Sequence, residues 1–338
     1  MRSIVRAKAP LRISLAGGGT DVSPYPEERG GAVISTTIDK YAYVVLKPQE
    51  EGIVVRSIGT DVILESDGCE DLRYDGNLDL VKAVIKHFQP SGGLELLLHS
   101  DAPMGAGLGS SSTLVVGIVG AFAHWLRIPF TRYEIAELAY HLEREEVGFR
   151  GGRQDQYSAT FGGFNFIEFQ GEASVVNPLR LPWNILNELH YCLLMVFTGQ
   201  TRLSPGIIRS QQERYEQRQL DTVTSLDRTK ELAYEMKDAL LQQRLIEMGE
   251  LLHEGWEQKK RFTDQITNPY IDSLYDAARE AGAIGGKLLG AGGGGHMLFL
   301  CRPDAKHRVA ARVTEQGAPP VPFAFDFDGL QTWTVGAD

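Results

Sequence analysis

The stretch DAPMGAGLGSSSTLVVGIVGAFAHWL, residues 101–126, passes from a loop rich in glycine and serine into an apolar run. The apolar run predicts a buried helix that begins near Ser110 to Ser112. The first backbone N–H groups of a helix have no partner within it, and the helix dipole adds partial positive charge there. The glycines before the helix allow a ligand to approach the backbone closely. These features favour an anion-binding loop, although a flexible loop with a serine N-cap would have a similar composition.

Two familiar nucleotide-binding loops do not fit this chain. The Walker pattern G-x-x-x-x-G-K-[ST] is absent, because GAIGGKL (282–288) has one residue too few before its Gly-Lys and a leucine after the lysine. The dinucleotide pattern G-x-G-x-x-G requires a strand before it and a helix after it. GAGGGG (290–295) has the right letters but precedes an expected strand, and GAGLGS (105–110) has Ser110 in place of the third glycine. A dinucleotide-dependent enzyme stays open as an alternative.

Composition and charge restrict the class of protein. The chain has 338 residues, of which 43% are hydrophobic and 23% charged, and this size favours about two domains. A formal net charge of −10 argues against a nucleic-acid or membrane-surface partner. The apolar run 114–126 is too short to span a bilayer. The three cysteines (Cys69, Cys192 and Cys301) lack metal-ligand spacing, and the N-terminus lacks the apolar segment of a signal peptide. We therefore expect reduced cysteines and a cytoplasmic protein.

Hydrophobic periodicity predicts an α+β protein. The composition of the sequence changes near residue 180, so we place domains at 1–182 and 183–338. Charge-rich residues 204–262 read as two or three solvated helices. Other expected helices cover residues 78–88, 132–148 with Thr131 as N-cap, 269–282 with Asn268 as N-cap, and a segment from about 304. Expected strands cover 1–15, as one or two pieces, then 30–48, 52–59, 61–66, 94–100, 190–199, 296–301, 321–327 and 330–335.

Three glycine motifs occur in one order along the chain: APLRISLAGGGTD (9–21), PMGAGLGSSS (103–112) and KLLGAGGGGHMLFL (287–300). Together they resemble the motifs of the GHMP kinase superfamily. The resemblance implies a two-domain α+β GHMP kinase fold, with an N-terminal domain like ribosomal protein S5 domain 2 and a ferredoxin-like C-terminal domain. It also implies ATP and Mg²⁺ as cofactors, with ATP between the domains.

Further segments resemble one branch of that superfamily, the D-glycero-D-manno-heptose 7-phosphate kinases. They are AGGGTDVSPY (16–25), LEREEVGFRGGRQDQYSATFGGFNF (142–166), FTGQTRLSPGII (197–208) and HEGWEQKKR (253–261). This branch phosphorylates the anomeric hydroxyl of a heptose phosphate on the route to GDP-heptose. The resemblance thus implies a sugar phosphate and ATP as small-molecule partners. A fucokinase-like or other free-sugar 1-kinase, or a sugar-sensing binder without turnover, stays open. The sequence does not fix the oligomeric state, and a homodimer is compatible with it.

The resemblance implies catalytic roles for Asp155, Arg12 and Lys8. Asp155 would accept the proton of the sugar hydroxyl or orient that hydroxyl. Local features alone also suit an N-cap before the short helix 156–160. Arg12 would pair with Asp155 and stabilise charge on the transferring phosphoryl group, with Lys8 as a second residue for that task. Arg12 would otherwise be a surface arginine on a strand.

The phosphates of ATP would bind the central motif, and Mg²⁺ would be held by Ser111 and Glu143. Glu143 stands in a run of acids that would more often face solvent. The residues implied in ATP binding are Pro103, Gly105, Ala106, Gly107, Leu108, Gly109, Ser110, Ser111 and Ser112.

The sugar would bind near Asp21, which accepts hydrogen bonds from hydroxyls. Gly18 and Gly19 stand where galactokinases have a Glu-His pair, and the space they leave suits a bulkier or phosphorylated sugar. Arg202 and Arg209, which flank the segment TRLSPGIIR (201–209), are candidates for holding a distal phosphate, and Arg153 and Lys40 are further ones. The residues implied in substrate binding are Gly17, Gly18, Gly19, Thr20, Asp21, Gly152, Arg153, Arg202, Gly292 and Gly293.

Overall fold

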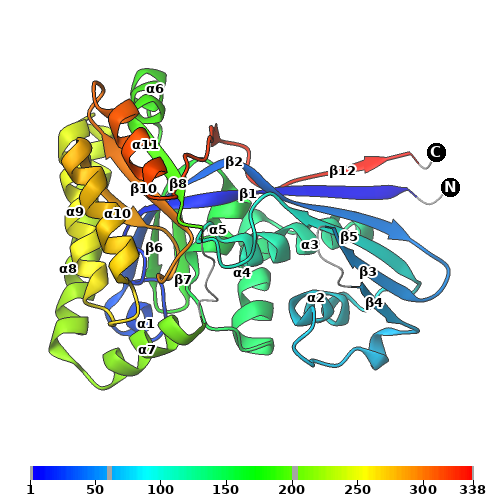
Figure 1. Ribbon diagram of the computed structural model, residues 1–338. Coiled ribbons are helices and arrows are strands. Elements are labelled where there is room, and N and C mark those ends of the chain that lie inside the picture. Colours follow the sequence, from blue (N-terminus) through cyan, green and yellow to red (C-terminus); the bar gives the residue numbers. More distant parts are fainter. Residues whose placement is uncertain (1–2, 59–62, 200–204, 337–338) are drawn as a thin grey trace.

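The computed structural model describes residues 3–58, 63–199 and 205–336 (Figure 1). Within these residues a large mixed sheet of nine strands has the order β12-β1-β2-β5-β3-β4, while β6 and β11 also pair with β2, and β7 pairs with β6. Its strands are β1 (Ile4–Ala16), β2 (Gly31–Pro48), β3 (Ile53–Ser57), β4 (Ile63–Ser66), β5 (Leu94–Ser100), β6 (Phe164–Gln170), β7 (Ala173–Pro178), β11 (Phe325–Asp326) and β12 (Gln331–Val335).

Two long antiparallel strands, β1 and β2, cross the molecule (Figure 1). β1 is one continuous strand despite Pro10, with register shifts between Pro10 and Arg12 and between Ser14 and Ala16. β2 changes partner along its length, because its first part pairs with β6 and its second part with β5. The strand pair therefore carries residues from the outer end of the sheet into the centre of the molecule, where Arg12 and Ser14 lie.

The helix predicted from the opening stretch is confirmed. Helix α3 (Ser110–Leu126) begins after Gly109 and is buried on nearly every side. Around the large sheet lie α1 (Tyr25–Arg29), α2 (Asp79–Phe88), α4 (Arg132–His141) and α5 (Gln154–Phe161). Thr131 forms the expected N-cap, as part of a capping box with Glu134. The expected helix 132–148 changes to π geometry over η2 (Leu142–Glu146), a local widening that recurs at functional sites.

A second sheet, in the order β8-β10-β9, lies in the later part of the chain. Its strands are β8 (Leu193–Phe197), β9 (Ala283–Leu288) and β10 (His296–Cys301), and its helices are α6 (Trp183–Cys192), α7 (Pro205–Glu216), α8 (Leu220–Leu241), α9 (Leu245–Lys260), α10 (Pro269–Ala281) and α11 (Lys306–Glu315). Helices α8, α9 and α10 stand side by side at one end of the molecule (Figure 1). Asn268 caps α10 as predicted.

Two expected strands in this part are shorter than predicted. The strand expected over 190–199 starts only at Leu193, because Ile185, Leu189 and Cys192 repeat at helical spacing and bury the inner face of α6. The strand expected over 321–327 is reduced to Phe325–Asp326.

The last strands return to the first sheet. β12 pairs with β1, and Phe325 and Asp326 of β11 pair with Ile38 and Thr37 of β2. One hydrophobic cluster also joins β1 and β2 to α8, α9 and β10. The boundary at residues 182/183 stays a prediction, with the added finding that 325–335 pack on the N-terminal sheet. Among the described residues, no helix has the length and apolar character needed to cross a membrane.

Candidate active site

A cavity of about 430 Å³ lies where the two parts of the chain meet. One side is formed by β1, the turn after it, the start of α3 and the segment 143–155. The other side is formed by α7, α9, β9 and the glycine loop after β9. Elements far apart in the sequence therefore contribute to one polar site.

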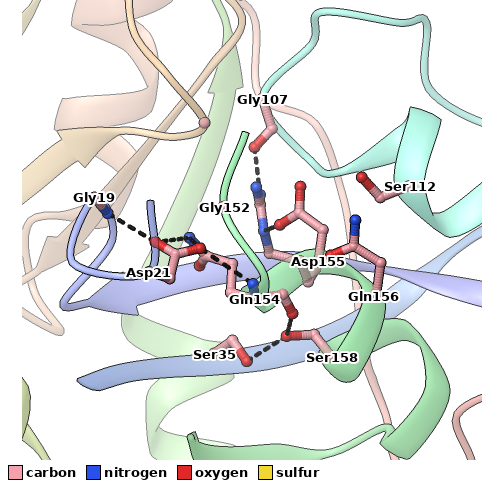
Figure 2. A network of polar contacts seen from close by, with 12 residues as sticks. Gly19, Asp21, Ser35, Gly107, Ser112, Gly152, Gln154, Asp155, Gln156 and Ser158 are labelled. Atoms are coloured by element: carbon pink, nitrogen blue, oxygen red, sulfur yellow. Dashed lines mark hydrogen bonds and ion pairs between the residues drawn. The ribbon is translucent and has the colours of Figure 1, made fainter. Parts of the chain in front are cut away.

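Arg12 and Asp155 form an ion pair at this cavity, with 2.7 Å between Arg12 Nε and Asp155 Oδ1. Arg12 Nη1 also donates to the carbonyl oxygen of Gly107 at 2.6 Å, a contact drawn in Figure 2. Arg12 is 4% exposed, so it is no surface arginine. Asp155 lies in the first turn of α5, whose N-cap is Arg153, so the N-cap alternative for Asp155 is wrong. Arg12 therefore holds Asp155 beside the glycine loop.

Asp21 is enclosed by backbone and amide donors (Figure 2). Its carboxylate accepts hydrogen bonds from the backbone N–H of Gly19 at 3.0 Å and of Gln154 at 3.1 Å, and from the Gln154 side chain. Gly152 packs against it so closely that a Cβ there would lie 1.9 Å from Asp21 Oδ2. Asp21 thus has a fixed orientation at the cavity wall.

The central loop is held by the second glycine loop. A Cβ on Gly107 would lie 2.6 Å from the Leu289 carbonyl oxygen, and a Cβ on Gly290 would lie 2.5 Å from Gly107 Cα. The backbone N–H of His296 donates to Ala106 O at 3.0 Å. The loop backbone and the start of α3, with Ser110, Ser111 and Ser112, therefore face the cavity as a rigid group of donors that fits phosphate oxygens.

Glu143 and Ser111 also line the cavity. Glu143 is 2% exposed, and its oxygens accept from Gln156 Nε2 at 2.7 Å and face Arg144 Nη1 at 3.0 Å. Arg144 also donates to Ser112 Oγ at 3.3 Å. Carboxylate and hydroxyl oxygens are the donors that Mg²⁺ prefers, and each Glu143 oxygen keeps a further lone pair. The residues present thus fit a single Mg²⁺. Within the described ranges no three His, Cys, Asp or Glu side chains cluster as a metal site by themselves.

Several residues expected at the site lie outside the cavity. Lys8 is four residues before Arg12 on β1, and its ammonium stacks 4.6 Å from the centre of the Tyr41 ring. Arg153 turns away to Glu27 and to the Gly171 carbonyl oxygen. The residues that do not line the cavity, although the resemblance implied them, are Lys8, Gly17, Thr20, Pro103, Ala106, Leu108, Arg153, Gly292 and Gly293. Arg202 lies outside the described residues.

The backbone explains most of these positions. Ala106 and Leu108 are buried beneath the loop, and Thr20 fastens its turn by donating to Gly17 O at 2.8 Å. Gly292 and Gly293 pack on Ile266, while Gly290 and Ala291 of the same loop reach the cavity.

The sequence analysis did not identify two lysines that line the cavity. Lys259 on α9 is 7% exposed and Lys287 on β9 is 6% exposed. Burial, together with the nearby Arg12 guanidinium, lowers the pKa of Lys287 to about 8. Burial and the charge of Lys287 lower the pKa of Lys259 well below its usual value. A signal existed for Lys287, the single charged residue in the strand AIGGKL (283–288); Lys259 stands among other charged residues and had none.

The GHMP kinase family models match the chain twice, with the N-terminal domain over residues 79–163 and the C-terminal domain over 236–319. The D-glycero-alpha-D-manno-heptose 7-phosphate kinase of Campylobacter jejuni is 38% identical, with 98% of this chain and 99% of that protein covered. The protein belongs to the GHMP kinase family. As a GHMP kinase it is a phosphotransferase with an alcohol group as acceptor, and the family uses ATP.

Solved structures of GHMP kinases have the same architecture. A D-glycero-D-manno-heptose 1-phosphate kinase from Bacteroides thetaiotaomicron has a TM-score of 0.83 at 34% identity, with 98% of this chain and 100% of that chain covered. A galactokinase from Lactococcus lactis shares the fold at 21% identity, with a TM-score of 0.76 and coverage of 98% and 95%. The two-domain GHMP kinase fold predicted from the three glycine motifs is confirmed. The segment GAGGGG (290–295) connects β9 directly to β10. It therefore lacks the following helix that the dinucleotide pattern requires.

Proposed function

We propose that this GHMP kinase transfers the γ-phosphoryl group of ATP, with Mg²⁺, to the C1 hydroxyl of D-glycero-D-manno-heptose 7-phosphate. The product would be the 1,7-bisphosphate, on the route to GDP-heptose for a bacterial surface polysaccharide. The observation that carries the catalytic part is the Arg12–Asp155 pair beside Gly107 at the start of α3. The choice of this sugar as the acceptor rests on the name of the C. jejuni relative.

The side chains have distinct tasks in this proposal. Asp155 Oδ2, the oxygen opposite the Arg12 contact, accepts the proton of the attacking hydroxyl or orients it. Arg12 holds that carboxylate and adds positive charge close to the loop that cradles phosphate. Asp21 accepts hydrogen bonds from sugar hydroxyls at a fixed position. Magnesium, held by Ser111 and Glu143, would neutralise phosphate charge.

The shape of the sugar side supports an acceptor other than galactose. The space that the sequence analysis expected at Gly19 for a bulkier sugar is occupied by Phe262, because a Cβ at Gly19 would lie 2.7 Å from its ring, so that part of the prediction is wrong. Gln211 closes the same turn by donating to Gly19 O at 3.1 Å. A glutamate and a histidine at positions 18 and 19 would not fit this arrangement without displacing the ring.

The test is ATP consumption with a panel of acceptors. We expect turnover with D-glycero-D-manno-heptose 7-phosphate and none with galactose. The panel includes the heptose 1-phosphate, because one relative is named for that compound, and the unphosphorylated heptose and fucose. Phosphorus NMR of the product identifies the new phosphate at C1. Turnover of free sugars with none of heptose 7-phosphate would overturn the proposal in favour of a free-sugar 1-kinase.

A further inference from the structure

The floor of the cavity holds two ammonium groups that have no carboxylate in ion-pair contact among the described residues. Lys259 Nζ donates to the carbonyl oxygens of Leu288 at 2.9 Å and Gly290 at 2.5 Å. Within the described residues, the hydrogen bond of Lys287 Nζ is a long contact of 3.5 Å to Leu15 O. Burying a charge without an opposite charge is costly. The protein therefore has two buried ammonium groups, each with an unfavourable desolvation free energy, at a position open to the cavity.

A hydroxyl without a partner lies beside them. Ser14 is 4% exposed, lines the same cavity, and its Oγ has no hydrogen-bond partner among the described residues. A Cβ on Gly18 would lie 3.0 Å from that oxygen, so the absence of a side chain at Gly18 keeps space in front of it. Buried polar groups are almost always paired, so an orphan hydroxyl facing a cavity indicates a ligand.

The charges along the wall favour an anion in this place. The acidic groups Asp155 and Glu143 are paired with Arg12 and Arg144. Asp21 already accepts several hydrogen bonds from Gly19 and Gln154. The wall therefore has two ammonium groups, at Lys259 and Lys287, that face the single carboxylate of Asp21, so this part of the cavity keeps a net positive charge.

These groups lie on the sugar side of the site. Lys259 and Lys287 share a small space with Gly17 and Gly18, the turn that leads to Asp21. The cradle proposed for the phosphates of ATP is formed by the glycine loop and the start of α3, and neither lysine has a hydrogen bond to it among the described residues.

We propose that Lys259, Lys287 and the Ser14 hydroxyl form a phosphomonoester subsite for the phosphate that the acceptor already carries. This assignment rests on the proposed function, a kinase with a phosphorylated acceptor. Two ammonium groups and a hydroxyl supply charged hydrogen bonds to phosphate oxygens. In this proposal the subsite holds the distal phosphate of the acceptor. The sequence analysis considered Arg153 for that role, but Arg153 is bound to Glu27.

The first experiment measures binding without turnover. Inorganic phosphate is titrated against the protein with the donor site filled by a non-hydrolysable ATP analogue, and the melting temperature is recorded. We expect phosphate to stabilise the unsubstituted protein. Lys287→Met should weaken phosphate about 10- to 100-fold, as loss of a charged hydrogen bond predicts, and Ser14→Ala should weaken it less. Lys260→Met is the control, because Lys260 neighbours Lys259 but pairs with Glu257.

Three results would overturn the subsite: no stabilisation of the unsubstituted protein by phosphate, unchanged affinity in Lys287→Met, or loss of phosphate binding when the ATP analogue is present. The last result would assign the lysines to the phosphates of the donor. Melting curves without phosphate show that each variant is folded.

The second experiment compares two acceptors. In Lys287→Met, kcat/KM for heptose 7-phosphate should fall about 10- to 100-fold more than kcat/KM for the unphosphorylated heptose. Equal losses for both acceptors would contradict the subsite. If the unsubstituted enzyme does not turn over heptose 7-phosphate, the proposed function fails, and the phosphate titration still decides the subsite by itself.

Discussion

At the scale of single residues, the proposed mechanism depends on Asp155. Replacing Asp155 by Asn keeps its shape but removes the proton acceptor. We expect kcat to fall by about 10² to 10⁴, with little change in the KM for ATP, because the phosphate cradle consists largely of backbone groups. Steady-state kinetics measure both constants. Asp264→Asn is the control, since Asp264 also pairs with an arginine, Arg214, but is 87% exposed. A variant with near-full kcat would exclude Asp155 as the base.

Lys287 should lower the stability of the fold below pH 8. The folded protein releases its proton at about pH 8, and the unfolded chain only at about 10.5. The unfolded state therefore binds more protons between these values, so stability rises with pH through this window. Lys287→Met should raise the free energy of unfolding at pH 7 by about 3 kcal/mol, because the pKa of Lys287 falls from 10.5 to about 8 on folding and each pKa unit corresponds to about 1.36 kcal/mol.

The gain from Lys287→Met should shrink as the pH rises from 8 towards 10.5. Urea unfolding at pH 7, 8, 9 and 10 measures it, with Lys260→Met as the reference. A gain of the same size at every pH would exclude the buried charge as its cause. Arg12, Lys259 and Asp21 are the charged groups that face Lys287 across the cavity floor, and they are unchanged in the comparison.

At the scale of elements, the two glycine loops act as one unit. Gly107 has φ +83°, and a Cβ there would also collide with Leu289 O. Gly107→Ala should therefore move both loops, lower the melting temperature and weaken ATP binding. Gly76→Ala is a matched control, because Gly76 has φ +89° but no atom within 4 Å of its Cβ position. Gly76→Ala should therefore cost only the strain of a left-handed backbone, about 1–2 kcal/mol, without a collision. Calorimetric titration of an ATP analogue measures binding, and equal effects of the two substitutions would contradict the coupling.

The sequence predicts elements whose signals are local. The caps at Thr131 and Asn268 and the start of α3 follow from neighbouring residues, and the structure has them as expected. The resemblance also identified Arg12 and Asp155, which the structure brings together although 143 residues separate them. Lys8 and Arg153 were misplaced because the direction of a side chain depends on partners such as Tyr41 and Glu27.

Positions that depend on packing between distant elements had no local signal. The position of Lys259 at the cavity depends on α9 packing against β9, and the pairing of β12 with β1 joins the two ends of the chain. Neither is encoded in a short stretch, because both result from the assembled sheets.

At the scale of the whole molecule, the two parts share a core and a sheet. Residues of β1, such as Leu11, belong to the same cluster as Leu232 of α8 and Leu298 of β10. β12 pairs with β1, and His124 of α3 contacts the hydroxyls of Thr332 and Thr334. The cavity lies where these parts meet, so its geometry depends on both.

We therefore expect the chain to unfold in one cooperative step. Trp125 lies in the last turn of α3 in the first part, and Trp256 is fully buried on α9 in the second. Two variants, each keeping only one of these tryptophans, report on the two parts by fluorescence. Their urea transitions should coincide with each other and with the loss of helical circular dichroism. The protein with all its tryptophans serves as the stability reference. An earlier transition at Trp256 would mean that the second part opens while the large sheet stays folded, and phosphate-loop contacts such as Gly107–Gly290 would then not couple the parts.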